Sequence, residues 1–294
     1  MSNRLVSAIK GSLASLVIAT NVVLVFSAMV PVALIKLILP FKAVRRVADS
    51  CLTALATEWV SINNAWIAAV GDTRWDVQGL EGLKRRGWYL VSVNHQSWVD
   101  ILVLQKVFHR RIPFLKFFLK HELIWVPVIG LAWWALDFPF MRRKAGSSAT
   151  DLATTRRACE KFKLIPTSVI NFVEGTRFTQ AKHDKQASPY VHLLKPKVGG
   201  MAVALATLGD EFDALLDVTI VYPQGTPSFW ELLSGQLKEV IVRVQPRAIP
   251  RELLGSDYQS DPQFRTRMQA WVNGMWLEKD RQIGELKQQV RPAA

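Results

Sequence analysis

The chain has 294 residues, of which 50% are hydrophobic and 21% are charged, and its 37 Lys and Arg against 24 Asp and Glu give a net charge of +13. This composition excludes a disordered or collagen-like chain and allows a large hydrophobic core. The two cysteines, Cys51 and Cys159, exclude a disulfide framework and a Cys/His zinc site. The positive charge indicates an anionic partner, for which a membrane surface and a nucleic acid compete.

An uncharged, largely apolar run of 25 residues, 11–35, lies near the N-terminus. A helix of about 20 apolar residues crosses a bilayer, so this run predicts a membrane segment. A cleaved signal peptide is the alternative, but its apolar region has only about 7 to 15 residues. Asn21 and Pro31 inside the run leave two geometries open, a single spanning helix and a hairpin of two half-helices.

The cations around this run are unevenly distributed. Arg4 and Lys10 precede it, and four cations follow it closely: Lys36, Lys42, Arg45 and Arg46. Because positive flanks stay on the cytoplasmic side, we expect the domain that follows to lie on the cytoplasmic face of an inner membrane. The lack of a disulfide framework agrees with this location.

Apolar residues at spacings of three and four between Phe41 and Val70 predict an amphipathic helix that connects the membrane segment to the rest of the chain. Beyond Gly71, runs of β-forming residues alternate with helical stretches. Strands are expected near residues 75–77, 88–93, 112–117, 168–172, 218–222 and 240–244, and helices at 98–108, 148–162 and 198–208. This alternation predicts an α/β fold with a mixed, largely parallel sheet flanked by helices.

The end of the chain predicts one more helix. Asp261 is the expected N-cap and Pro262 the first helical residue, and one face of the helix is apolar, so we expect it to pack on the sheet. The chain is thus expected to consist of a membrane anchor (1–40), an amphipathic connecting helix (41–72), an α/β domain (73–260) and a C-terminal helix packed on that domain (261–294).

His95 directly follows an expected strand, and therefore stands at the edge of the sheet where α/β folds place their ligands. Asp100 lies in the first turns of the next expected helix. It is near enough to accept the imidazole Nδ1 hydrogen and leave Nε2 as a base, the arrangement that hydrolases and transferases use. A His that satisfies a backbone group and an Asp that caps a helix explain the same spacing equally well.

A second polar cluster follows the strand expected at 168–172 and reads Glu174, Gly175, Thr176 and Arg177. The glycine allows a sharp turn, the threonine offers a hydrogen-bond donor, and the arginine offers a planar fork suited to a phosphate. Three further cations are candidates for the same site: Arg142, Lys195 and Lys197. Each of them is equally explained as a solvated surface charge, but together they predict a phosphate site. The sequence has no glycine-rich phosphate loop and no nucleophile elbow.

The order of these motifs resembles the glycerolipid acyltransferase family, most closely the 1-acylglycerol-3-phosphate acyltransferases. The segment Asn-His-Gln-Ser-Trp-Val-Asp at 94–100 is followed by Glu-Gly-Thr-Arg at 174–177, and segments 120–130 and 219–223 are similar to two further family blocks. The resemblance covers roughly residues 75–225. The sequence departs from the family pattern at two positions. Val173 stands where family members often have Pro, and Tyr222 precedes Pro223 in the last block, so no role is assigned there.

The resemblance implies acyl transfer from acyl-CoA or an acyl-carrier protein to the free hydroxyl of lysophosphatidic acid, giving phosphatidic acid with no metal or bound cofactor. It implies that His95 is the base and that Asp100 orients it. Arg177 then binds the acceptor phosphate, with Glu174, Gly175 and Thr176 shaping the turn and with help from Arg142 and from Lys195 or Lys197. Residues 114–119 and Lys120 are candidates for an acyl groove, although a buried strand explains them equally well.

Three rival functions remain. A remodelling acyltransferase for other lysophospholipids is closest, and a non-catalytic membrane scaffold is another. A membrane-tethered nucleic-acid binder would use the charge of +13, but the basic residues are scattered and the sequence has no recognised nucleic-acid motif. We therefore expect membrane lipid, a lysophospholipid and a thioester donor as partners, and no nucleic acid.

Overall fold

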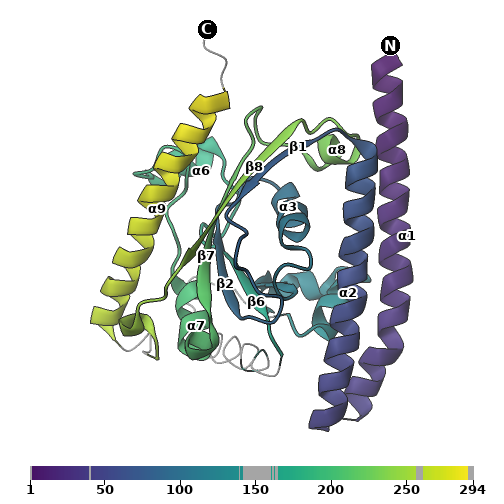
Figure 1. Ribbon diagram of the computed structural model, residues 1–294, viewed down its shortest axis with the longest axis horizontal. Coiled ribbons are helices and arrows are strands. Elements are labelled where there is room, and N and C mark those ends of the chain that lie inside the picture. The colour runs from purple at the N-terminus through teal and green to yellow at the C-terminus, as the bar shows by residue number, and fades with distance from the viewer. Residues whose placement is uncertain are drawn as a thin grey trace.

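The computed structural model describes residues 2–39, 41–138, 140–141, 160, 162, 165–255 and 261–290. Within these residues the centre is a six-stranded sheet with the strand order β1-β8-β7-β2-β6-β3 (Figure 1). The strands are β1 (Arg74–Gln78), β2 (Tyr89–Val93), β3 (Leu115–Phe117), β6 (Ser168–Phe172), β7 (Ala214–Val221) and β8 (Glu239–Arg247). Strand β8 runs antiparallel to β7, and the other neighbouring pairs are parallel. The predicted mixed, largely parallel sheet is therefore confirmed.

Helices cover both faces of this sheet and create two cores (Figure 1). On one face, Val91 and Val218 pack with α2 (Lys42–Val70) and α3 (Val99–Phe108). On the other face, Leu90 and Leu215 pack with α7 (Gly199–Leu208) and α9 (Pro262–Val290). Because both faces are covered, the central strands are nearly continuous runs of buried residues, as parallel sheets require.

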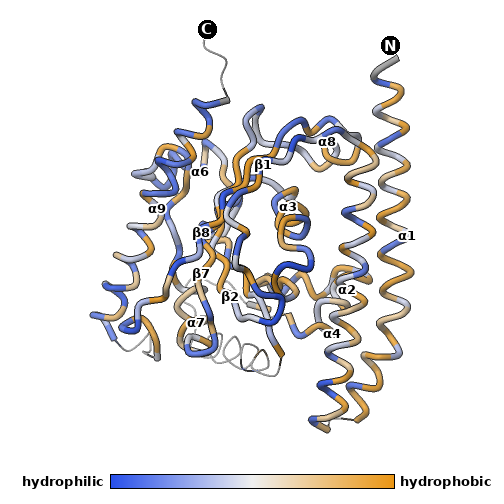
Figure 2. The backbone as a smooth tube through the Cα atoms, viewed as in Figure 1, coloured by the Kyte–Doolittle hydropathy of each residue, from blue (hydrophilic) through white to orange (hydrophobic). Residues whose placement is uncertain are grey.

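The N-terminal apolar run forms part of one continuous helix, α1 (Ser2–Ile38), with Pro31 inside it. Of the two geometries that the sequence left open, the structure therefore has the unbroken helix. Helix α1 packs antiparallel along α2 (Figure 1). Between them, the side-chain amide of Asn21 donates to Asn63 Oδ1 and to the Trp59 carbonyl, both at 3.1 Å. Among the described residues, the segment Arg4–Ile38 is the one long and apolar enough to cross a membrane, and Figure 2 shows hydrophobic residues along most of its length.

The expected helices agree with the structure where it describes them. The helices predicted at 98–108 and 198–208 are α3 and α7, and the helix predicted at 148–162 falls largely outside the described residues. The Asp261 carboxylate accepts a hydrogen bond from the Phe264 main-chain N–H at 2.9 Å, which confirms the N-cap of α9. The remaining elements are β4 (Leu119–Lys120), η1 (His121–Trp125), α4 (Ile129–Ala135), β5 (Phe140–Met141), α6 (Gln180–Gln186), η3 (Gly209–Glu211), α8 (Phe229–Leu233) and η4 (Arg251–Leu253). The division of the chain into four segments stays a prediction.

Candidate active site

His95 and Asp100 meet at the carboxyl end of β2. The loop between β2 and α3 turns the chain back, so that Nδ1 of His95 lies 2.8 Å from Oδ2 of Asp100. A carboxylate can only accept, so Nδ1 carries the hydrogen and Nε2 is left with its lone pair. The pair predicted from spacing alone is therefore formed, with the imidazole and the carboxylate in hydrogen-bond contact.

The Asp100 carboxylate is fully buried and accepts four hydrogen bonds. Besides His95, the main-chain N–H groups of Gln96 and Ser97 donate to Oδ2 at 2.6 and 2.9 Å. The hydroxyl of Tyr222 donates to Oδ1 at 2.7 Å. A buried charge is tolerated only when it is paired in this way.

Tyr222 is a residue of the site that the sequence reasoning left without a role. It directly follows β7, which neighbours β2, so that its hydroxyl reaches Asp100. Burial, together with the adjacent Asp100 charge, raises the pKa of Tyr222 well above its ordinary value of 10.0. The phenol therefore stays protonated and remains a donor. The Tyr-Pro pair at the end of an expected strand was the available signal, but nothing in the sequence connects it to Asp100.

The imidazole of His95 is held in one orientation. Its ring stacks on Phe172 with a centroid distance of 4.0 Å and an interplanar angle of 24°. The preceding residue, Asn94, pairs with the main chain of Ile220 through two hydrogen bonds of 2.9 Å. These contacts fix both the ring and the backbone that carries it. The His95 side chain is still 13% exposed, so a substrate can reach it.

Glu174 is buried behind His95. Its Oε1 accepts from the main-chain N–H of His95 at 2.8 Å, and its Oε2 accepts from that of Leu194 at 2.9 Å. Burial raises the pKa of Glu174 from 4.5 to about 8. Gly175 follows with φ at 68°, a conformation that glycine adopts without strain and that turns the chain after β6. Glu174 thus holds the loop that carries His95 in place through its hydrogen bond to the His95 main chain.

The end of this turn brings cations close to the histidine loop. The Phe178 main-chain N–H donates to the His95 carbonyl at 2.7 Å. The exposed Arg177 places its guanidinium 4.9 Å from the ring centre of Trp98. Lys182, from α6, donates to the Thr176 hydroxyl at 2.9 Å and to the Arg177 carbonyl at 2.8 Å. Lys182 is a second cation of this cluster, and the sequence analysis did not single it out.

The roles of the other predicted phosphate ligands stay predictions. Lys195 and Lys197 are exposed on the segment after Leu194, and neither is among the described residues that line the cavity beside His95. The main-chain N–H of Lys197 donates to the Val173 carbonyl at 2.7 Å. Arg142 lies outside the described residues.

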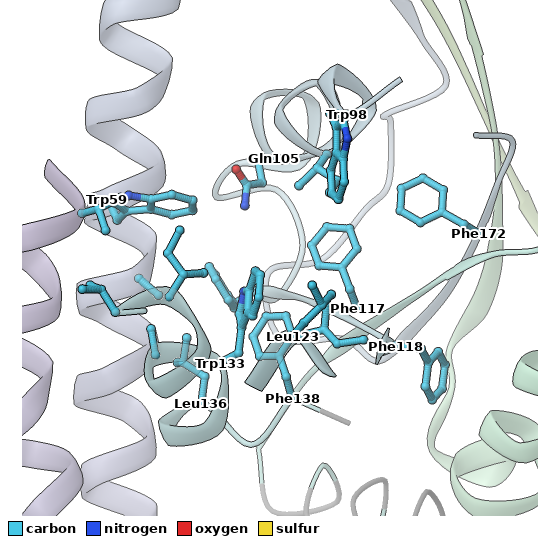
Figure 3. Close-up of a pocket in the computed structure, with 18 of the residues that line it drawn as sticks. Trp59, Trp98, Gln105, Phe117, Phe118, Leu123, Trp133, Leu136, Phe138 and Phe172 are labelled. Atoms are coloured by element: carbon cyan, nitrogen blue, oxygen red, sulfur yellow. The ribbon is translucent and has the colours of Figure 1, made fainter. Parts of the chain in front are cut away.

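A cavity of about 460 Å³ begins beside His95 and the Gly175 to Arg177 turn. Figure 3 shows the aromatic side chains that line it, among them Trp59 of α2 and Trp133 of α4. Four residues of the predicted groove segment 114–119 also line it: Phe114, Phe117, Phe118 and Leu119. Helix α1 contributes Val22, Val25, Phe26 and Met29. The N-terminal helix pair therefore forms one wall of a largely apolar cavity whose polar end holds His95.

Comparison with known proteins identifies the family of the chain. The family model described as Acyltransferase matches residues 74–224, just over half of the chain. The chain belongs to the acyltransferase family, and the resemblance found in its motifs is confirmed.

The individual relatives have low sequence identity to this chain. Lysocardiolipin acyltransferase 1 of Danio rerio is 27% identical over 207 residues, covering 66% of this chain and 51% of that protein. The delta 1-acyl-sn-glycerol-3-phosphate acyltransferase of Mus musculus is 26% identical over 204 residues, covering 65% and 51%. The chain thus spans about half the length of these curated relatives. The crystal structure of the 1-acyl-sn-glycerophosphate (LPA) acyltransferase PlsC from Thermotoga maritima shares the fold, with a TM-score of 0.55 at 19% identity over 98% of this chain and 100% of that one.

Proposed function

We propose that the chain transfers a fatty acyl group from acyl-CoA or an acyl-carrier protein to the free hydroxyl of lysophosphatidic acid, giving phosphatidic acid for phospholipid synthesis. The observation that carries this proposal is the hydrogen-bonded pair of His95 and Asp100 at the polar end of an apolar cavity. A relative named as a 1-acyl-sn-glycerol-3-phosphate acyltransferase supports the choice of acceptor.

In this reaction the acceptor hydroxyl oxygen attacks the thioester carbonyl carbon, and its proton passes to Nε2 of His95. The tetrahedral intermediate then collapses, the carbon–sulfur bond breaks, and the same proton neutralises the leaving thiolate. Asp100 accepts the Nδ1 hydrogen throughout and stabilises the imidazolium that forms. The products are an ester and a free thiol, no acyl-enzyme forms, and no metal or bound cofactor takes part. General base catalysis of this kind accelerates a reaction by roughly 10² to 10⁴.

The acceptor phosphate binds the cation cluster of Arg177 and Lys182. Arg177 is exposed beside the cavity, and its planar fork matches two oxygens of a phosphate monoester. Lys182 adds a second charge while it holds the Thr176 hydroxyl and the Arg177 carbonyl in place. Within the same proposal, Arg142 assists, and Lys195 and Lys197 act as more distant cations that attract the substrate.

The acyl chain occupies the apolar cavity, and the protein works at a membrane surface, with its catalytic domain on the cytoplasmic side. Helix α1 leaves a row of large apolar side chains exposed: Leu5, Val6, Ile9, Leu13, Leu16, Val17, Val23, Leu24, Val30, Leu34, Ile35, Leu37 and Ile38. An apolar surface of this size marks a membrane or protein contact, and the cations that flank the apolar run suit anionic lipid headgroups. The lysolipid then reaches His95 without leaving the lipid phase.

A membrane-fraction assay with His95→Ala tests the proposal, using both thioester donors and a panel of lysolipids. We expect transfer to fall at least a hundredfold while expression and membrane association are kept. His192→Ala is the matched control, because the His192 ring lies 3.3 Å from Lys287 Nζ of α9 and does not line the cavity. A His95→Ala protein whose rate of acyl transfer stays within a few-fold of that of the unmodified chain would contradict the mechanism.

The same panel of lysolipids distinguishes the proposed function from a second candidate, remodelling of other lysophospholipids. The relative named as a lysocardiolipin acyltransferase favours this second candidate. A remodelling enzyme would use lysocardiolipin or choline-bearing lysolipids better than lysophosphatidic acid.

A further inference from the structure

One polar side chain interrupts the apolar wall of the cavity. Trp98, the N-cap of α3, lines it together with Ile101 and Gln105 of that helix, at helical spacings of three and four. Gln105 is 8% exposed, and its Oε1 is buried without a hydrogen-bond partner among the described residues. Figure 3 shows its carboxamide at the cavity, between Trp59 of α2 and Trp98.

A buried amide oxygen without a partner is costly, whereas Met has nearly the same length and carries no such penalty. Gln105 therefore does not serve the stability of α3 in the way that its buried neighbours Val103 and Leu104 do. Pockets use a few placed polar groups in an apolar lining to select ligands. A carboxamide in this wall has the chemistry of such a selecting group.

The position of Gln105 along the cavity defines which part of an acyl chain it would meet. Trp98 lies next to Arg177, near the end that holds His95. Gln105 follows seven residues later on the same helix, about 10 Å further along its axis. The amide therefore faces the interior of a bound chain and lies beyond the reach of the thioester.

We propose that Gln105 selects acyl chains that carry a hydroxyl group in the interior of the chain. This inference rests on the proposed function and names the donor class for it. A hydroxyl both donates and accepts, so it satisfies either the oxygen or the nitrogen of the carboxamide. An unsubstituted chain leaves the amide oxygen without a partner in a largely apolar cavity, and this difference favours the hydroxylated donor.

The test compares 10-hydroxyoctadecanoyl-CoA with octadecanoyl-CoA, using the full-length protein in membranes and lysophosphatidic acid as the acceptor. For the unmodified chain we expect kcat/KM on the hydroxylated donor to equal or exceed that on the plain donor. In Gln105→Met, the ratio of the two kcat/KM values should fall about tenfold, because the hydroxyl then enters an apolar wall unpaired. Ile101→Met, which alters the same wall without changing its polarity, should keep the ratio of the unmodified chain.

Each outcome decides between the two proposals. A ratio that is the same in Gln105→Met and the unmodified chain overturns the selection by Gln105, as does an unmodified chain that prefers the plain donor. The second comparison needs no variant and holds if Gln105→Met does not fold. Absence of transfer from every donor overturns the proposed function, and this inference with it, whereas good transfer with an unchanged ratio overturns the inference alone.

Discussion

Replacing Tyr222 with Phe removes a single hydrogen bond from Asp100 and little else. The ring stays in its place at the end of β7, and the three donors to Oδ2 remain. Only Oδ1 loses its partner, and with Asp100 fully buried no water takes over. The substitution therefore isolates the contribution of one contact that reaches the pair of His95 and Asp100 from a distant part of the chain.

The expected cost follows from the charge of the acceptor. A hydrogen bond to a charged group contributes about 1.5 to 3 kcal/mol, so the free energy of unfolding should fall by about 2 kcal/mol. In addition, the carboxylate gains freedom to turn away from the His95 Nδ1 hydrogen. Since Tyr222 does not line the cavity, KM should stay nearly constant while kcat falls about tenfold.

Urea unfolding and steady-state kinetics of Tyr222→Phe measure the two effects, with Tyr190→Phe as the matched control. Tyr190 also packs in the core, at 7% exposure, but its hydroxyl makes no hydrogen bond among the described residues. A Tyr222→Phe protein as stable and as active as the Tyr190→Phe protein would refute the role of this contact.

Three further predictions concern other parts of the molecule. Arg177→Lys should raise KM for lysophosphatidic acid about tenfold but leave KM for a neutral lysolipid of equal length, whereas equal effects on both acceptors would remove Arg177 from the phosphate site. Since burial raises the pKa of Glu174 from 4.5 to about 8, the folded protein holds the extra proton between these values and its stability falls as pH rises through them. Between pH 5 and 8, urea unfolding should show that the free energy of unfolding falls by about 3 kcal/mol less in Glu174→Gln than in the unmodified chain. The same pH dependence in both proteins would contradict the raised pKa of Glu174. Deleting residues 1–39 should remove the cavity wall formed by α1, lower kcat/KM for long-chain donors and let high salt strip the protein from vesicles, whereas salt-resistant binding of the truncated form would contradict an attachment through α1.

The parts of the site that the sequence predicted are the local ones. His95 and Asp100 lie five positions apart on either side of a strand-to-helix loop, so secondary structure alone brings them together. The sheet was predictable for a similar reason, because runs of β-forming residues need no knowledge of their neighbours. Strand β7 was predicted too short, since Asp217 interrupts its apolar pattern. In the fold, the Asp217 carboxylate pairs with Lys279 at 2.7 Å and with Arg247 at 3.1 Å.

Contacts that depend on strand order were not predictable. Glu174 reaches the His95 backbone because β2 and β6 are parallel neighbours, with Val93 opposite Phe172, so that the residues after each strand meet. Tyr222 reaches Asp100 because β7 neighbours β2 on its other side. A single sequence specifies strands but not which strands pair. The contribution of α1 to the cavity was also not predictable. A helix that contacts lipid and a helix that lines an apolar cavity have the same apolar composition.

The contacts of α1 with the rest of the protein restrict how the molecule can sit in a bilayer. Near its start, Gly11 lies so close to Trp230 of α8 that a Cβ there would meet the indole at 2.6 Å. Near its end, Lys36 donates to the Ala135 carbonyl at 2.9 Å and pairs with Asp49 at 2.6 Å. These contacts are 25 residues apart, about 38 Å along the helix, which exceeds the roughly 30 Å of bilayer hydrocarbon. An upright α1 would carry the charged domain into the hydrocarbon. Under the proposed membrane attachment, we therefore expect the helix pair to lie along the membrane surface, with only its outer face immersed in one leaflet.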